Sequence, residues 1–305
     1  MNDSKVKIWL QAARLRTLPL SVSGILVGSA FAAYKNAFDW SIFIGCIITT
    51  LGLQILSNFA NDYGDGVKGT DNTDRIGPKR VLQSGLVGVQ ELKKAIYWTV
   101  GLTMLSIIVL IYVSFKDIGF NANAILFVLL GIAALVAAIK YTVGKSAYGY
   151  SGFGDVFVFV FFGGVSVMGS SFLYLKTLEP LLWLVAIAMG LLSTGVLNLN
   201  NMRDIDNDRK MNKNTLVVKI GSQKAKYYHH TILVLAILCL FLFSYKLGLT
   251  PSYKGWMYLI LLFPLGKHFV FVARNKVLVD FNPELKKLAL ITFGIALLLS
   301  LGMVL

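Results

Sequence analysis

The sequence predicts an all-α polytopic membrane protein with about nine transmembrane helices, folded as a single domain over residues 1–305. Hydrophobic residues make up 56% of the chain and charged residues only 14%, whereas about 25% of the residues in a typical soluble domain are charged. The apolar residues lie in stretches of about 20, the length of helix that crosses a hydrocarbon core of about 30 Å. Alternating segments of about ten residues, which build membrane β-barrels, are absent from the sequence, so helices are the expected spanning elements.

Nine apolar stretches follow one another along the chain, after a short segment that is expected to be amphipathic. In that segment Trp9 and Leu10 lie near basic residues, which indicates a location at the membrane interface. We reject a cleavable signal peptide ending near Phe31, because its removal would take away the first span. In chain order, the spans are expected at Leu18–Tyr34, Trp40–Ala60, Ala95–Phe115, Phe120–Ile139, Phe153–Tyr174, Pro180–Leu199, Tyr227–Gly248, Gly255–Val272 and Leu288–Leu305.

Lysine and arginine are distributed unevenly between the loops on the two predicted sides of the membrane. The amino-terminal segment and the loops after the second, fourth, sixth and eighth spans carry 23 of the 29 residues, and the opposite loops carry five. This positive-inside pattern predicts a cytoplasmic amino terminus, an external carboxyl terminus and a multi-pass protein of the bacterial cytoplasmic (inner) membrane. Because topology accounts for the net charge of +14, the lipid bilayer is an expected partner and nucleic acid is not.

Acidic residues gather in two long loops, about Asn61–Lys94 and about Asn200–Lys226, on the predicted cytoplasmic side. Twelve of the 15 acidic residues lie on that side, and eight of them belong to these two clusters. Acidic residues contribute little to membrane orientation, so topology does not explain the clustering. The clusters follow the second and sixth spans, four helices apart, which suggests a pseudo-repeat with a site between its halves.

The second cluster has a helical spacing. Asn200, Asp204 and Asp208 would project from one face of a helix that continues beyond the sixth span. We therefore expect a stripe of oxygen ligands there.

The first cluster repeats the step of four with Asn61 and Asp65. Three glycines, at positions 64, 66 and 69, are expected to end the helix, so Asp71 is expected on a loop. Carboxylate and amide oxygens are hard ligands that suit Mg²⁺ held together with phosphate oxygens.

The same loops supply cations that suit an anionic ligand: Lys68, Arg75, Lys79, Arg80, Arg203, Arg209, Lys210 and Lys213. Carboxylates combined with Arg and Lys at one rim suit a metal-bridged diphosphate. The alternative is a solvated loop whose charges serve only topology. The repeated spacing after two separate spans favours the diphosphate site.

These motifs resemble those of the UbiA superfamily of intramembrane aromatic prenyltransferases. The first family motif, Asn-Asp-x-x-Asp with a later Asp, is matched by Asn61, Asp62, Asp65 and Asp71; the second is matched by Asn200, Asp204 and Asp208. The resemblance covers about Arg14 to Gly221 and is greatest to the branch that acts on 1,4-dihydroxy-2-naphthoate. The strings that carry it are Arg14–Pro19, Asn58–Asp65, Asp74–Pro78, Lys140–Gly144, Gly152–Asp155, Asn201–Asp204 and Lys213–Gly221. The chain departs from the family pattern at Asp71, which lies six residues after Asp65, and at Asn212, where the family usually has glycine.

The resemblance implies an Mg²⁺-dependent transfer of a polyprenyl chain from polyprenyl diphosphate to 1,4-dihydroxy-2-naphthoate, with decarboxylation to demethylmenaquinone, at a site open to the cytoplasm. The implied metal ligands are Asn61, Asp62, Asp65, Asp71, Asn200, Asp204 and Asp208. The implied catalytic residues are Asp65, Asp204, Asp155, Tyr141 and Lys145, of which the last three would hold the acceptor. The implied substrate-binding residues are Arg16, Asn58, Lys68, Arg75, Arg80, Arg203 and Lys213.

Two alternative functions stay open at this point. A prenyltransferase could act on another aromatic acceptor, such as 4-hydroxybenzoate, and only the branch-specific strings favour naphthoate. A transporter is the alternative from a different class, but transport sites typically lie near the bilayer midplane. Here every Asp and Glu lies at or beyond a predicted span end, which favours chemistry at the cytoplasmic face.

Other residues have less specific patterns. Phe153, Phe157, Phe159, Phe161 and Phe162 in the fifth span would either line an isoprenoid tunnel or pack against lipid. We expect Cys46 and Cys239 to be small apolar residues in their spans, without a disulfide. His229 and His230 are expected at the interface, and Lys267 and His268 are expected to snorkel towards it.

Overall fold

The protein is described by a computed structural model that covers residues 5–248 and 253–305. Within these residues, nine helical segments are long and apolar enough to span a membrane, and the predicted all-α class is confirmed. The helices are α1 (Lys5–Ala13), η1 (Leu15–Thr17), α2 (Leu18–Tyr34), α3 (Trp40–Val67), α4 (Val89–Phe115), α5 (Ala122–Lys140), η2 (Tyr148–Tyr150), α6 (Gly154–Phe159), η3 (Val160–Gly169), α7 (Ser170–Leu175), α8 (Leu182–Arg203), α9 (Ile205–Lys210), α10 (Leu216–Ile220), α11 (Ser222–Lys246), η4 (Tyr253–Leu261), α12 (Leu262–Arg274), η5 (Leu278–Asp280) and α13 (Phe281–Val304).

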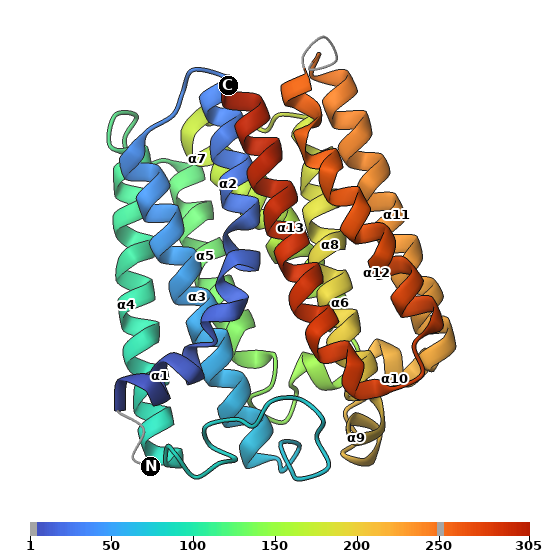
Figure 1. Ribbon diagram of the computed structural model, residues 1–305. Helices are drawn as coiled ribbons and strands as arrows, with labels where there is room; N and C mark the ends of the chain where they lie inside the picture. Colours follow the sequence, from blue (N-terminus) through green and yellow to red (C-terminus); the bar gives the residue numbers. More distant parts are fainter. Residues whose placement is uncertain (1–4, 249–252) are drawn as a thin grey trace.

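The long helices run along one bundle axis, and the two Asp-rich regions lie at the same end of it (Figure 1). The loop between α3 and α4, together with α9 and α10, lies at the lower end in this view, where α1 also lies. Helix α13 ends at the opposite, upper end. The side of the membrane that each end faces stays a prediction.

The end of α3 differs from the sequence expectation. The helix continues through Gly64 and Gly66 to Val67, and the left-handed Gly69 follows it. A β-carbon on Gly64 would lie 2.6 Å from Thr142 Oγ1, and one on Gly66 would lie 2.6 Å from Leu82 Cδ2. These two glycines therefore allow close packing instead of ending the helix, which was the wrong part of the prediction.

The second motif forms a helix with a break. Helix α8 ends at Arg203, Asp204 has φ −96° and ψ 9°, and α9 begins at Ile205. The spacing of four survives the break, because the Asp204 amide donates to the Asn200 carbonyl and the Asp208 amide to the Asp204 carbonyl. The predicted stripe is thus present, but it extends over two consecutive helices, α8 and α9, instead of one.

Small residues bring the helices of the fifth span close to their neighbours. A methyl group at Gly24 or Gly28 of α2 would overlap Ser166 or Ser170, and one at Gly163 would overlap the backbone of α8 at Ala186. In lipid, the hydrophobic effect does not drive helices together, because lipid tails are as apolar as the side chains. Helices therefore associate through close van der Waals packing, which small residues allow. Residues 160–169 of this span form a π-helix, η3.

The histidines near α11 and α12 are buried, and the expectation that His268 snorkels was wrong. His229 and His268 are 0% and 1% exposed, and their Nε2 atoms lie 2.8 Å apart. His268 Nδ1 lies 2.9 Å from Glu284 Oε1 on α13. This acidic partner, 16 residues further along the chain, keeps the ring inside the bundle. Cys46 and Cys239 are free thiols, as predicted.

Candidate active site

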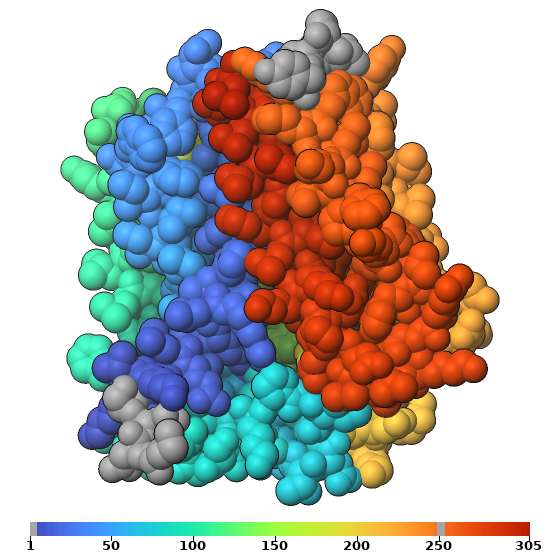
Figure 2. Space-filling model, viewed as in Figure 1, coloured from blue at the N-terminus to red at the C-terminus, as the bar shows by residue number. Residues whose placement is uncertain are grey.

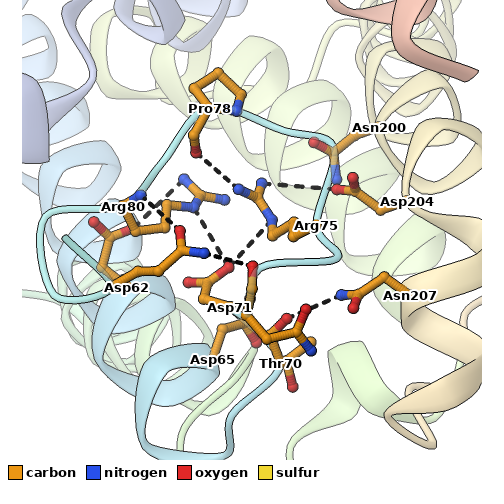
Figure 3. A network of polar contacts seen from close by, with 12 residues as sticks. Asp62, Asp65, Thr70, Asp71, Arg75, Pro78, Arg80, Asn200, Asp204 and Asn207 are labelled. Carbon is orange, nitrogen blue, oxygen red and sulfur yellow. Dashed lines mark hydrogen bonds and ion pairs between the residues drawn. The ribbon is translucent and has the colours of Figure 1, made fainter.

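Five aspartates of the two motifs are buried at one end of the bundle. Asp62, Asp65, Asp71, Asp204 and Asp208 have exposed fractions between 1% and 7%. Buried carboxylates are costly unless cations or hydrogen-bond donors surround them. Figure 3 shows that basic side chains from the α3–α4 loop point into this group, between the aspartates of α3 and those of the α8 end.

The aspartates of α3 have separate partners. Arg14 forms an ion pair and hydrogen bond with Asp62, and Arg80 Nη1 lies 3.5 Å from the same Oδ1 atom. Asp65 accepts a 2.7 Å hydrogen bond from the Tyr150 hydroxyl and lies 3.3 Å from Lys213 Nζ. The η2 turn and the loop after α9 therefore meet the first motif at Asp65.

Asp71 lies on the loop after α3, as predicted, and faces two guanidinium groups. Arg75 Nε is 3.1 Å from Asp71 Oδ1, and Arg80 Nε is 3.8 Å from it. Neither oxygen of Asp71 has a hydrogen bond of good geometry among the described residues. Burial raises the pKa of this carboxyl, although Arg80 opposes the rise.

Arg203 holds the second motif. Its Nε donates to Asp204 Oδ1 at 3.0 Å and its Nη2 to Asp204 Oδ2 at 2.6 Å, a two-pronged pairing. The same Nη2 donates to Asn200 Oδ1 at 2.8 Å. Arg75 Nη2 lies 3.7 Å from Asp204 Oδ2, so Arg75 reaches both Asp71 and Asp204 and links the two motifs. Burial works against ionisation of Asp204, but the bonds and charge of Arg203 outweigh it and lower the pKa of Asp204.

Asp208 differs from the other four because no side chain in the described residues forms a hydrogen bond or ion pair with it. Burial raises its pKa to about 7; the charge of Lys213 opposes this rise, and those of Asp204 and Asp65 add to it. Burial also lowers the pKa of Lys213, but Asp65 and Asp208 outweigh burial and raise it.

The donor set fits a hard divalent cation, although the described residues hold no group of three His, Cys, Asp or Glu side chains close enough to bind one. In the structure, the aspartates that have partners form ion pairs with Arg and Lys instead. Both oxygens of Asp71 and Oδ1 of Asn207 are nevertheless buried without a hydrogen-bond donor. Oxygen ligands of this kind suit Mg²⁺, which keeps several waters and substrate oxygens in its shell.

Most of the predicted substrate-binding residues lie around this group. Arg75, Arg80, Arg203 and Lys213 contact its aspartates, as described above. Lys68 Nζ donates to the Thr142 carbonyl at 2.8 Å and lies over the Tyr150 ring. The remaining cations point elsewhere: Lys210 pairs with Asp74 at the surface, and Lys79 and Arg209 are exposed.

Of the three residues predicted to contact the acceptor, the structure places two beside the site and one at the surface. Tyr141 is half-buried, and burial of its hydroxyl together with the charges of Asp65, Asp155 and Asp208 raises the pKa of that hydroxyl. Asp155 is buried, has Tyr228 as its hydrogen-bond partner, and leaves Oδ1 without one among the described residues. Lys145 is exposed on the turn after α5 and has no contact with the site among those residues.

An apolar cavity of about 340 Å³ begins beside the aspartates and extends into the bundle. Asn58, Asn61 and Tyr141 line it near the site, whereas Cys46 and Leu173 line it towards the opposite end. Asn58 also donates to the Ala13 carbonyl at 2.9 Å, and Asn61 Oδ1 accepts a 3.3 Å bond from Thr142.

The aromatic residues of the fifth span have two locations. Phe157, Phe161 and Phe162 line the cavity. Phe153 is 57% exposed, and Phe159 packs against Gly190 of α8. Three of the five thus line the cavity and Phe153 lies at the surface, whereas Phe159 packs inside the bundle, which neither alternative predicted.

A second cavity, of about 300 Å³, lies between η1 and the α3–α4 loop. Arg16, for which the described residues show no ion pair, lines it with Arg14, Asp62, Lys79 and Arg80. Sequence reasoning assigned no contact to Arg14 itself and missed Tyr150 and Thr142. Arg14 and Thr142 were part of family strings, which were their only signals, and Tyr150 had none.

Comparison with known proteins identifies the family. The model of the UbiA prenyltransferase family matches residues 21–293. The chain belongs to the UbiA prenyltransferase family. The resemblance seen in the motifs is thereby confirmed, and membership of an enzyme family favours catalysis over the transport alternative.

Relatives of this UbiA-family protein cover nearly its whole length. It is 45% identical over 284 residues to a 1,4-dihydroxy-2-naphthoate octaprenyltransferase of Escherichia coli, covering 93% of this chain and 91% of the relative. It is 39% identical over 305 residues to the enzyme of the same name from Haemophilus influenzae, covering 99% and 97%.

Solved structures share the fold of this UbiA-family protein. A UbiA homologue from Aeropyrum pernix has a TM-score of 0.67 at 15% identity, covering 95% of this chain and 98% of that one. A homologue from Archaeoglobus fulgidus, bound to DMAPP and Mg²⁺, has a TM-score of 0.62 at 13% identity, covering 94% and 98%.

Proposed function

We propose that this protein transfers a polyprenyl chain from polyprenyl diphosphate to 1,4-dihydroxy-2-naphthoate, releasing carbon dioxide and diphosphate and giving demethylmenaquinol, which a separate oxidation converts to demethylmenaquinone. The observation that carries the proposal is that the buried, cation-rich aspartate group adjoins an apolar cavity at Asn61 and Tyr141. A lipid diphosphate needs a charged site for its diphosphate group and an apolar cavity for its hydrocarbon chain. The names of the relatives from Escherichia coli and Haemophilus influenzae support the naphthoate acceptor.

The charged end would bind the diphosphate. Asn61, Asp62, Asp65, Asp71, Asn200, Asp204 and Asp208 would hold Mg²⁺, which neutralises charge on the departing diphosphate when it is bound. The homologue bound to DMAPP and Mg²⁺ supports this metal. Arg75, Arg80, Arg203 and Lys213 contact the aspartates, so their positive charges lie where they can stabilise the same departing group.

The cavity would hold the isoprenoid chain and keep water out. The allylic C–O bond breaks with its electron pair leaving on the diphosphate, and the electron-rich ring carbon then forms the new C–C bond. The carboxylate carbon leaves as carbon dioxide, and its bonding electrons return to the ring. An apolar lining protects the allylic cation from water, which would otherwise capture it.

The acceptor would lie between Tyr141 and Asp155. Asp155 has an unsatisfied buried oxygen that can accept a hydrogen bond from a ring hydroxyl. Tyr141, at the junction of cavity and aspartates, would contact the acceptor carboxylate as a single donor. One contact orients the acid without the strong ion pair that would oppose its loss.

The cytoplasmic membrane is the proposed location, with the aspartate end facing the cytoplasm. In the described part of the chain, nine helical segments are long and apolar enough to span a membrane, which supports a multi-pass protein. The distribution of Lys and Arg supports the orientation.

The decisive experiment follows the acceptor's carboxyl carbon. Purified protein is incubated with Mg²⁺, octaprenyl diphosphate and carboxyl-labelled dihydroxynaphthoate, and label released as carbon dioxide is counted against prenylated product. We expect a ratio of one to one. Prenylated product that retains the label would leave only a broader prenyltransferase function, and a parallel reaction with 4-hydroxybenzoate would show whether that acceptor is used instead.

A further inference from the structure

Asn282, in the first turn of α13, contacts both Asp-rich regions. Its Oδ1 accepts a 3.0 Å hydrogen bond from Arg203 Nη1, at the end of α8. Its Nδ2 donates a 3.4 Å hydrogen bond to the carbonyl of Ile76, on the loop between α3 and α4. The side chain thus joins three segments that lie far apart in the sequence. In Figure 2 the α3–α4 loop (cyan) meets the start of α13 (red) at this end of the bundle.

Arg203 is the group that Asn282 orients. Its guanidinium is 3% exposed and carries five N–H donors in a fixed plane. Asp204 and Asn200 accept from Nε and Nη2. Asn282 accepts from Nη1, at another edge of the same planar group, so the guanidinium is held along two edges instead of one.

The segment 75–78 is the second group that Asn282 positions. Arg75 Nη1 donates to the Pro78 carbonyl at 2.8 Å, which closes the segment on itself. A β-carbon on Gly77 would lie 2.5 Å from Arg75 Nη2 and 2.8 Å from Arg203 Nη2. Gly77 therefore lies directly against both guanidinium groups, and the bond from Asn282 to Ile76 holds this backbone in place over them.

The first turn of α13 is itself fixed in the bundle. Glu284, two residues after Asn282, is 3% exposed and contacts His268 of α12 at 2.9 Å. His268 in turn contacts His229 of α11. A side chain on an element held in this way is oriented more accurately than one on a free loop.

We propose that Asn282 is a positioning residue for the prenyl diphosphate, holding Arg203 and the 75–78 segment in the arrangement that receives the diphosphate group. The inference rests on the proposed function, because it concerns the same site. It adds a residue of α13 to the site around the two Asp-rich motifs.

The test compares Asn282→Ala and Asn282→Asp with a matched control, Asn275→Ala. Asn275 lies in the loop before α13, and its side chain contacts only Val277 among the described residues. Calorimetry measures binding of inorganic diphosphate in the presence of Mg²⁺ to the purified protein, so one readout does not depend on catalysis. Steady-state kinetics give KM separately for the polyprenyl diphosphate and for the aromatic acceptor.

We expect Asn282→Ala to weaken diphosphate binding roughly tenfold, raise KM for the donor and leave KM for the acceptor and the melting temperature nearly unchanged. Asn282→Asp keeps an acceptor for Arg203 but loses the donor to Ile76, so its affinity should lie between those of wild type and Asn282→Ala. Asn275→Ala should match wild type.

Wild-type diphosphate affinity in Asn282→Ala would overturn the inference. So would equal losses for donor and acceptor in both variants together with a fall in melting temperature, since those are the effects of a purely structural residue. If Asn282→Ala fails to fold, Asn282→Asp alone must show the selective donor effect. A wild-type protein that binds diphosphate but prenylates no aromatic acceptor would refute the proposed function and leave this inference standing.

Discussion

At the scale of single residues, Asp206 and Asp208 show how two aspartates of one short helix differ. Both belong to α9, but Asp206 is exposed and Asp208 is 3% exposed. Asp208 faces Lys213 and the other aspartates, and no ion pair among the described residues compensates it. A buried carboxylate in that position is the side chain with most to gain from a bound cation.

We therefore predict that Asp208→Ala lowers turnover roughly a hundredfold and raises the Mg²⁺ concentration needed for half-maximal activity. Asp65→Ala and Asp204→Ala should also abolish most turnover without preventing membrane insertion, and excess EDTA should do so reversibly. Asp206→Ala, on the exposed side of the same helix, should retain wild-type kinetics. Full activity of Asp208→Ala at low Mg²⁺ would contradict a metal role for this residue.

Tyr150 offers a second test at this scale. Its hydroxyl donates to Asp65 and lies 2.6 Å from Thr70 Oγ1. Tyr150→Phe removes a hydrogen bond to a charged group, so we expect kcat/KM for the donor to fall about tenfold while the melting temperature stays close to that of wild type. Tyr227→Phe is the matched control, because Tyr227 is 66% exposed. Equal kinetics for the two variants would show that the Asp65 contact does not matter.

Individual site residues could be predicted only where local geometry places them. Asn200, Asp204 and Asp208 were found from sequence because helical spacing alone puts them on one face. The partners of Asp62 and Asp65 could not be found in this way. Arg14 lies 48 residues from Asp62, and Tyr150 lies 85 residues from Asp65. Only the packing of helices brings such residues together.

At the scale of elements, the fifth span shows how backbone form shapes the cavity. The π-helix η3 presents Phe161, Val165 and Gly169 to it, and Phe157 precedes them on α6. Short π-helical segments are uncommon and often occur at functional sites. Hydropathy predicted this span but carried no signal for its π form.

A bulky residue in this lining should change which donors are used. We predict that Val165→Trp raises the ratio of kcat/KM for farnesyl diphosphate to that for octaprenyl diphosphate by about tenfold or more, because the larger ring occupies space needed by a long chain. Val160→Trp places the same ring on a residue that is 43% exposed and outside the cavity lining. Competition between the two donors, with products identified by mass, measures the ratio. An unchanged ratio in Val165→Trp would mean that the chain lies elsewhere.

Element boundaries were predicted well wherever hydropathy changes sharply. The expected first span coincides with α2, and the ends of the second and third spans at Trp40 and Phe115 coincide with the ends of α3 and α4. The helix ends next to the aspartates were placed less well. At the end of α3, glycine has two opposite uses, helix termination and close packing, and sequence alone does not distinguish them.

At the scale of the whole molecule, an odd number of spans requires the two ends of the chain to lie on opposite sides. We predict that reporter fusions at Lys79, Lys145, Lys213 and Lys276 read as cytoplasmic, and that fusions at Lys116, Lys176 and the carboxyl terminus read as external. The excess of Lys and Arg on the first group of loops is the physical reason. A cytoplasmic carboxyl terminus would refute the nine-span arrangement.

The contact of Asn282 with Arg203 and Ile76 has a consequence for biosynthesis. A ribosome completes both Asp-rich motifs well before it reaches α13, whose first turn carries Asn282, 79 residues after Arg203. Until that helix is inserted, the guanidinium of Arg203 and the backbone at Ile76 lack the partner that joins them. If Asn282 positions Arg203 and the 75–78 segment as proposed, a nascent chain that carries the aspartates of both motifs still lacks part of the diphosphate site until α13 has been translated.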